Sequence, residues 1–247
     1  MNSAPDHSLN MLVRKLESVA PLSHDERQAI QSLPVMTRIL QPGQDIVRDG
    51  GQPSQCCLVL DGWTARYKLL SEGRRQILSF HIPGDIPDLQ SLHLAVMDHS
   101  LCSMTVSTVA FIPHESLRDL TARFPGLAAA LWRDTLIDAA IFREWMIGIG
   151  RKSAHGRIAH LFCEMYLKLH AVGLADHHRM PWPLTQIDIG DALGLSNVHV
   201  NRVLQNLRNQ KLIILDRRNL TMGDWEGLSE MGEFDPVYLH LERRAAA

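Results

Sequence analysis

Turns that contain glycine recur roughly every ten residues between Val35 and Pro113. Of all the features of this sequence, this spacing limits the possible folds most strongly. The turns are predicted at Pro42-Gly43, Gly50-Gly51, Asp61-Gly62, Glu72-Gly73 and Pro83-Gly84. Short apolar runs alternate with these turns, a pattern that is typical of all-β proteins. The region is therefore predicted to form an all-β barrel or sandwich, with its last strands in SLCSMTVSTVAFIPH.

Helices are predicted on both sides of this region, so the expected fold class is α+β. Residues 8–33 predict short helices, one of which begins at Ser23, because Ser23 and Glu26 have the spacing of a capping box. HESLRDLTARF predicts another short helix. Residues 126–150 form a long run with few helix breakers, and residues 151–170 predict an amphipathic helix before a loop rich in Gly, Pro and His.

The long helix carries apolar residues on more than one face, among them Leu131, Ile137, Ile141 and Trp145. One face can pack on the β region, and the other then needs a partner. A second copy of the same helix is the simplest partner, and the alternative is a helix buried wholly within one chain. Because a helix that is apolar all round must be covered on every side, we favour dimerisation through these four residues.

The segment TQIDIGDALGLSNVHVNRVLQNLRNQKLI has the pattern of a helix-turn-helix. Ile189 and Leu193 are expected to face inward from the first helix, and Gly194 suits the turn because glycine adopts a left-handed conformation without strain. Ser196 is placed to cap the second helix. KLIILDRRNLTM follows and predicts two short strands joined by a basic turn at Arg217-Arg218, which is a wing.

Composition and charge exclude several classes of protein. With 45% hydrophobic and 21% charged residues, the chain is expected to be globular. We expect a soluble, cytoplasmic protein with no membrane partner, because there is no signal-peptide pattern and no run of about 18 apolar residues. The net charge of −2 does not exclude nucleic acid, since residues 179–218 hold six Lys or Arg against three Asp.

These motifs, in this order, resemble the Crp–Fnr family of transcription regulators over nearly the whole chain. QPGQDIVRDGGQPSQCCLVLDGWTARYKLLSEGRRQILSFHIPGDI resembles the family's cyclic-nucleotide-binding β-roll, and GRIAHLF resembles the start of its DNA-binding domain. The resemblance implies an N-terminal antiparallel β-roll of the double-stranded β-helix or jelly-roll type, a long dimerisation helix and a C-terminal winged helix-turn-helix. It also implies a homodimer on a two-fold symmetric double-stranded DNA operator, with RNA polymerase as a further partner.

The expected domains follow from this resemblance. They are a sensor domain at 1–123, a dimerisation helix at 124–150, a DNA-binding domain at 151–224 and a C-terminal extension at 225–247. The extension is expected to form an extra helix and a loop that brace the DNA-binding domain.

The sensor segment departs from family members that bind cyclic nucleotides. Those members carry an arginine that neutralises the phosphate, whereas residues 76–117 contain no Lys or Arg and do contain Asp85, Asp88 and Asp98. A buried phosphodiester without a cationic partner would be heavily penalised by desolvation. We therefore expect no cyclic AMP binding of the usual kind and an unknown effector, if any. Arg74 and Arg75 are expected to be solvated surface charges.

No cofactor is expected either. Family members with an iron–sulfur cluster carry an N-terminal cysteine cluster, and the first cysteine here is Cys56. His177 and His178 are interpreted as solvated residues. Cys56 and Cys57 are the best redox candidates, but neighbours on a strand point to opposite faces, so one buried and one partly exposed thiol is favoured.

The helix expected to enter the major groove also departs from the family. Members that read a TGA-type half-site usually have glutamate where this chain has Val198, and valine can only pack against a base, such as a thymine methyl group. Arg202 matches the family's arginine, which contacts guanine or phosphate, and Ser196 and Thr185 match hydroxyls that contact phosphates. The residues expected to contact DNA are Thr185, Gln186, Ser196, Asn197, Val198, His199, Asn201, Arg202, Arg217 and Arg218.

Two functions other than DNA-binding regulation are compatible with parts of the sequence. One is a ligand-binding or redox-responsive signalling module whose helix-turn-helix mediates protein contacts, and the basic wing argues against it. The other is an enzyme, but the sequence has no nucleophile elbow, HExxH, P-loop or pair of carboxylates with catalytic spacing. Asp85 and Asp88 are the nearest to such a pair, and a hydrogen-bonded turn explains them better.

Overall fold

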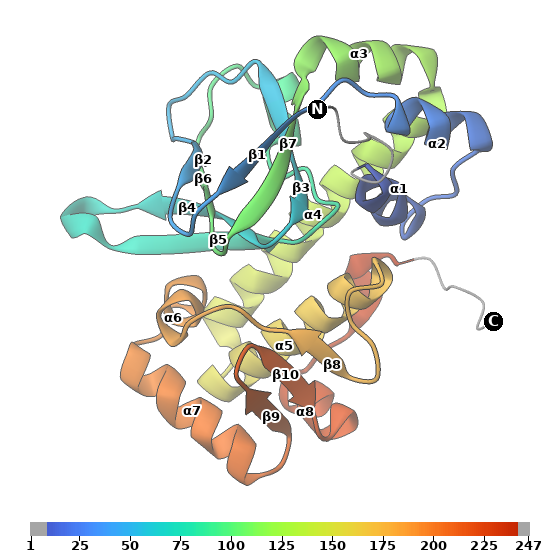
Figure 1. Cartoon of the computed structure of the whole chain (residues 1–247). Coiled ribbons are helices and arrows are strands. Elements are labelled where there is room, and N and C mark those ends of the chain that lie inside the picture. The colour runs from blue at the N-terminus through green and yellow to red at the C-terminus, as the bar shows by residue number, and fades with distance from the viewer. Residues whose placement is uncertain (1–8, 242–247) are drawn as a thin grey trace. The chain divides into compact units, whose positions relative to one another are not determined.

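The structure, a computed structural model, describes residues 9–241, and these form two compact units (Figure 1). The first unit comprises residues 9–68, 80–138 and 240–241. The second comprises residues 69–79 and 139–239. The final residues of the expected C-terminal extension, 242–247, lie outside the described residues.

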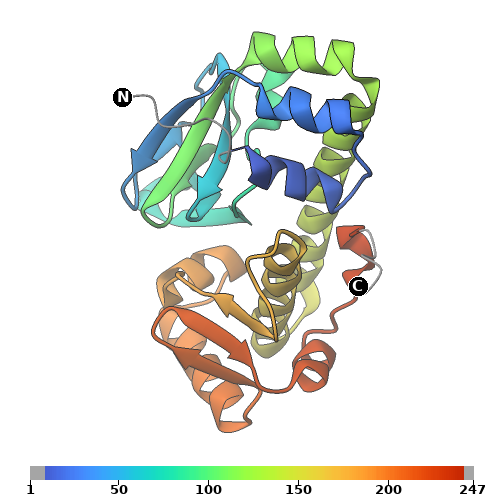
Figure 2. The ribbon, with the colours of Figure 1, turned by 45° about the vertical axis from the view of Figure 1, so that its right-hand side comes forward.

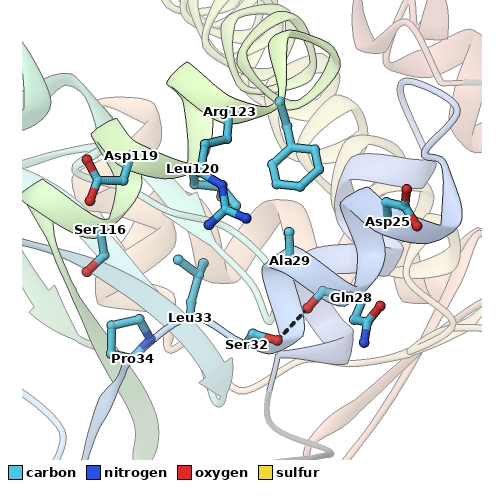
Figure 3. A pocket seen from close by; sticks show the side chains of 11 residues that line it. Asp25, Gln28, Ala29, Ser32, Leu33, Pro34, Ser116, Asp119, Leu120 and Arg123 are labelled. Carbon is cyan, nitrogen blue, oxygen red and sulfur yellow. Dashed lines mark hydrogen bonds between the residues drawn. The ribbon is translucent and has the colours of Figure 1, made fainter.

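The first unit is a β-roll flanked by short helices. Its elements are α1 (Asn10–Glu17), α2 (His24–Gln31), β1 (Met36–Leu40), β2 (Asp45–Val47), β3 (Gln55–Asp61), β4 (Thr64–Leu69), η3 (Leu89–Leu92), β6 (Ser100–Ser103), β7 (Ser107–Pro113), α3 (His114–Arg123) and the first part of α4 (Pro125–Arg151). Helices α1 and α2 lie side by side (Figure 2). The capping box predicted at Ser23 and Glu26 is present at the start of α2.

The strands of the roll form a three-stranded sheet in the order β1-β7-β3 and a four-stranded sheet in the order β2-β6-β4-β5. β5 spans Arg75–His81, and the 3₁₀ turn η2 (Ser71–Gly73) precedes it. Pairs β1–β7, β3–β7, β2–β6 and β4–β6 are antiparallel. The five predicted turns are confirmed, because each has a glycine with positive φ: Gly43, Gly50, Gly62, Gly73 and Gly84.

Strand β3 is covered on both faces. Cys56 and Leu58 pack into a core shared with α1, α2, α3 and the start of α4, whereas Cys57 packs on the other face with Leu101 and Val109. Both thiols are therefore fully buried, at 0% exposure, and the expectation that one would be partly exposed is wrong. Burial raises the pKa of both thiols, which disfavours the reactive thiolate.

The second unit contains η2 and most of β5, which lie within residues 69–79, together with the rest of α4 and the helix-turn-helix. Its other elements are α5 (Ala154–Ala171), β8 (Arg179–Pro181), α6 (Gln186–Leu193), α7 (Asn197–Asn209), β9 (Ile213–Asp216), β10 (Asn219–Met222), α8 (Trp225–Met231) and the 3₁₀ turn η4 (Pro236–Leu239). The sheet has the antiparallel order β8-β10-β9. β8 lies within the segment that the sequence predicted as a loop.

The residues expected to form the dimer contact are already covered within the single chain. Leu131, Ile137, Ile141 and Trp145 are only 4–8% exposed. They belong to the face of α4 that packs on its own chain. The apolar side chains that α4 leaves exposed are others, including Trp132, Leu136 and Met146.

Within residues 9–241, no helix is both long and apolar enough to cross a membrane. Among the same residues, no three His, Cys, Asp or Glu side chains are grouped so that they could hold a metal ion.

Candidate DNA-binding surface

The turn between α6 and α7 is built by two glycines. Gly194 has φ 66° and ψ 39°, the left-handed conformation predicted for it, and its N–H donates to the carbonyl of Gly190. A Cβ at Gly190 would lie 2.6 Å from the carbonyl oxygen of Leu195, so α6 and the turn approach too closely for any side chain there. The sequence did not identify position 190 as one that requires glycine, because the requirement arises only from the close approach of α6 to the backbone of Leu195.

Both helices of the motif have capped N-termini. The Ser196 hydroxyl accepts a hydrogen bond from the N–H of His199 (3.2 Å), as predicted. Thr185 and Asp188 form a capping box at the start of α6, and the Thr185 hydroxyl also donates to the Asp188 carboxylate (2.7 Å). Ile189 and Leu193 are buried, as predicted for the inner face of the first helix, and Val200 and Val203 of α7 are buried as well.

The opposite face of α7 is exposed. Val198 is 80% exposed, Asn197 and Arg202 are exposed, and His199 and Asn201 are half-buried. The side-chain amide of Asn201 donates to the Oε1 atom of Gln186 (3.1 Å), so α6 holds this residue in place. The first turns of α6 and α7 thus present their polar side chains together.

The wing is a hairpin of β9 and β10 against β8. Arg217 has φ 53° at its tip, and both Arg217 and Arg218 are exposed. The carbonyl of Arg218 accepts a hydrogen bond from the N–H of Trp182 (2.8 Å), which fixes the tip to the segment after β8. Helix α7 packs against β9, so the wing and the helix are parts of one packed module.

Arg75 is bound to the outer side of α6. Its Nη2 donates to Asp188 (2.7 Å) and its Nε to Asp191 (2.8 Å), while the side-chain amide of Gln76 donates to the carbonyl of Ala192 (3.1 Å). The expectation that Arg75 would be a solvated surface charge is wrong, since it carries two ion pairs. Arg74, by contrast, is mostly exposed.

In the first unit, a buried cation stands beside the segment that precedes η3. Residues 76–117 contain no Lys or Arg, but Arg66 reaches this segment from β4. Its Nε donates to the carbonyl of Pro87 (2.6 Å), and its guanidinium forms an ion pair with Asp138 of α4. The expectation that no cation would be present is therefore wrong, because Arg66 lies in β4, outside residues 76–117, and the fold brings it to this segment.

Asp85 holds the turn around Gly84 by a hydrogen bond, as expected, whereas the side chain of Asp88 is bonded to strand β3. Asp85 accepts a hydrogen bond from the N–H of Ile82 (3.1 Å) and forms an ion pair with Lys15 (3.1 Å). Asp88 accepts from the N–H of Cys57 (2.7 Å). Burial raises the pKa of Asp88 to about 7.

Comparison with known proteins finds the same two modules. Residues 37–124 match the cyclic nucleotide-binding domain family, and residues 156–231 match the Crp-like helix-turn-helix domain family. The chain is 28% identical over 206 residues to the nitrogen fixation regulation protein FixK of Rhizobium meliloti (strain 1021), across 82% of this chain and 90% of that protein. It is 24% identical over 208 residues to the transcriptional activator protein FnrA of Stutzerimonas stutzeri, across 84% of each.

A solved structure agrees with these matches. The structure of FixK2 from Bradyrhizobium japonicum is 27% identical and aligns with 81% of this chain and 98% of its own, with a TM-score of 0.73. The β-roll, the long helix and the winged helix-turn-helix thus occur here in the order found in these relatives. The chain therefore belongs to the Crp–Fnr family of DNA-binding transcription regulators.

Proposed function

We propose that the protein acts as a homodimer on a two-fold symmetric operator, with one α7 helix in each of two successive major grooves. The observation that carries this proposal is the exposed polar face of α7, which begins at a capped N-terminus. Helix-turn-helix proteins read bases with the N-terminal residues of the second helix, and their half-sites lie about 34 Å apart. Asn197, Val198 and Arg202 would face the bases, while Thr185 and the wing arginines would contact phosphates.

The proposed dimer contact is a stripe of exposed positions along α4. Trp132, Leu136, Ala139, Arg143, Met146 and Gly150 are all exposed. They are separated alternately by four and three residues, which is the spacing of a coiled-coil seam. Large apolar side chains on it are strongly exposed in the single chain, with Trp132 at 65% and Met146 at 72%. Pairing this α4 stripe with that of a second copy would remove these side chains from water.

We further propose that the β-roll does not bind cyclic AMP. Arg66 and Lys15 are cations beside the segment before η3, and each is already paired, Arg66 with Asp138 and Lys15 with Asp85. A phosphodiester would have to compete with the Asp138 carboxylate for the buried Arg66 guanidinium, so part of its binding free energy would be spent on breaking an existing ion pair. Isothermal titration calorimetry with cyclic AMP should show no saturable heat at micromolar concentrations. A saturable isotherm would contradict the proposal.

The remaining parts of the proposal follow from a role in transcription. The protein would act in the cytoplasm, contact RNA polymerase at its target promoters and catalyse no reaction of its own. Any effector would act by favouring the DNA-competent arrangement over another.

Selection from a random double-stranded DNA library, with purified protein and no added effector, tests the central proposal. We expect a palindrome with half-sites one helical turn apart, and we expect Arg202→Ala to abolish its enrichment without changing the size of the protein in solution. Enrichment of a single, non-repeated site would contradict the two-fold arrangement. Unchanged enrichment by Arg202→Ala would remove this arginine from the surface that reads the bases.

A further inference from the structure

The C-terminal extension is fastened to the junction between α4 and α5 by a buried lysine. Only Lys152 and Ser153 separate the two helices, and Lys152 is 8% exposed. Its ammonium donates to His160 Nδ1 (2.9 Å), to the carbonyl of Gly232 (2.8 Å) and to that of Glu233 (3.1 Å). An ammonium group has three N–H donors, so these three acceptors satisfy it completely. Two of them belong to the extension.

The same contact fixes the tautomer of His160 and extends the network. An ammonium can only donate, so Nδ1 accepts and the proton of the neutral ring lies on Nε2. Burial, assisted by the charge of Lys152, lowers the pKa of His160 to about 4 and keeps the ring neutral. Nε2 then donates to the Tyr238 hydroxyl (2.9 Å), which donates to Glu164 (2.7 Å). The indole N–H of Trp145 donates to the same carboxylate (3.1 Å).

The extension lies against α5 at a distance that only glycine permits. A Cβ at Gly232 would be 2.8 Å from the backbone nitrogen of His160 and 3.1 Å from its Cα. Across the same contact, a Cβ at Gly156 would be 3.2 Å from the carbonyl oxygen of Met231. The hydrogen bonds of Lys152 depend on this close approach, because their acceptors are backbone carbonyls next to Gly232.

A second side chain connects the junction to the helix-turn-helix. Arg157 of α5 donates from Nε to the carbonyl of Lys152 (3.0 Å) and from Nη1 to the carbonyl of Leu193 (3.0 Å). Leu193 is the last residue of α6, immediately before the glycine turn. A continuous set of hydrogen bonds therefore runs from the extension, through Lys152 and Arg157, to the turn that orients α7.

We propose that residues 225–239 are a positioning element for DNA recognition and that Lys152 and Tyr238 are its positioning residues. The extension fixes the α4–α5 junction, and the junction fixes the turn before α7. In a dimer joined through α4, the geometry of this junction sets the separation and angle of the two α7 helices. Residues 225–239 therefore determine the half-site spacing that the protein binds most tightly. This inference rests on the proposed dimeric function.

Operators that differ only in spacing provide the test. Three proteins are compared: the wild type, Tyr238→Phe and Lys152→Met. Each is titrated with the selected operator, with operators lengthened or shortened by one base pair at the centre, and with a single half-site. One base pair changes the separation by about 3.4 Å. We expect each variant to lose at least fivefold of the wild-type preference for the selected spacing while its half-site affinity stays within twofold.

Matched variants keep the result interpretable. Tyr238→Phe removes one hydroxyl and keeps the ring that stacks on His160 at 5.7 Å, so it tests the network even if Lys152→Met fails to fold. Gly232→Ala pushes the extension away from α5 without removing a polar side chain, and it should act like Tyr238→Phe. Tyr67→Phe, which removes a hydroxyl bonded to Asp45 in the other unit, should leave the spacing preference unchanged.

The outcomes separate the inference from the function on which it rests. If the wild-type protein prefers one spacing and folded Tyr238→Phe shows the same preference, the positioning role is wrong and the dimeric function stands. Equal weakening of every operator and of the half-site would indicate a merely structural role and would also overturn the inference. A wild-type protein without any spacing preference would overturn both the dimeric function and the inference.

Discussion

At position 198 a valine points into solvent from the first turn of α7, with 80% of its surface exposed. An apolar side chain so exposed contributes little to folding, so its identity is free to serve recognition. Valine can pack on a thymine methyl group, whereas glutamate accepts a hydrogen bond from the amino group of cytosine.

Val198→Glu should therefore change the operator and leave the fold unaffected. In selection from the random library, we expect enrichment of a C·G pair at one position of each half-site, with a discrimination of about 1–3 kcal/mol. The melting temperature should stay that of the wild type. An unchanged motif would place Val198 away from the bases.

The carboxyl group of Asp88 should make stability depend on pH. Its pKa rises from 3.8 to about 7 because it is buried. Between these values the native state holds the proton and the unfolded state does not, so the free energy of unfolding falls as the pH rises from about 4 to 7. Above pH 7 the loss is complete.

Asp88→Asn lacks this titration, so the variant and the wild type should differ least near pH 4. Between pH 4 and pH 8 we expect the stability of the variant to rise relative to the wild type by up to about 4 kcal/mol, since each unit of pKa shift corresponds to about 1.4 kcal/mol. Urea denaturation at both pH values measures the difference, with the exposed Asp61→Asn as control. A gap that does not widen with pH would contradict the assignment.

At the scale of single elements, the helix-turn-helix tolerates no side chain at Gly190. The missing Cβ would meet the backbone of Leu195, which cannot rotate away as a side chain could. We expect Gly190→Ala to lower the free energy of unfolding by about 1–3 kcal/mol and to weaken operator binding, because α7 must shift.

Gly148→Ala is the matched comparison. Gly148 lies inside α4, and a Cβ there would meet nothing within 4 Å. Alanine should stabilise the helix by up to about 1 kcal/mol, measured by the same urea denaturation. Destabilisation of equal size by both substitutions would show that contact with Leu195 is not the cause.

How far the sequence predicts each element depends on how local its determinants are. The capping box at Ser23, the cap at Ser196 and the left-handed Gly194 were predictable, because each requires only residues within a few positions. The pairing of Asn201 with Gln186 was not, because it depends on how α6 crosses α7. Most residues on the exposed polar face of α7 also depend only on local sequence, which is why this face could be predicted.

At the scale of the whole molecule, the sequence did not predict which apolar and charged residues would be buried. Hydrophobic periodicity showed that α4 is apolar on several faces, but not which face its own chain would cover. Ile137 and Trp145 are buried, and the apolar side chains that α4 leaves exposed include Trp132, Leu136 and Met146. Arg66 was missed for a similar reason, since strand pairing brings it to a segment distant in sequence.

The α4 stripe should therefore control assembly. Leu136→Glu places a charge in the proposed seam, and we expect a monomer at micromolar concentration with operator affinity reduced at least tenfold. Arg133→Glu, at the neighbouring exposed position outside the stripe, should remain dimeric in sedimentation experiments. The melting temperature of the wild type should rise with protein concentration, as for any coupled dimer, and that of Leu136→Glu should not. A wild-type monomer would refute the seam.

The two-residue joint between α4 and α5 determines where this chain can accept change over evolutionary time. Inserting one residue there would displace Lys152 relative to α5 by up to about 3.6 Å, the span of one extended residue, because Ser153 already has extended backbone angles. That displacement would separate the ammonium of Lys152 from the carbonyl of Gly232, and the carbonyl of Lys152 from the guanidinium of Arg157. New operator preferences can therefore arise by substitution on the exposed face of α7, whereas insertions and deletions at residues 152–153 should be eliminated by selection.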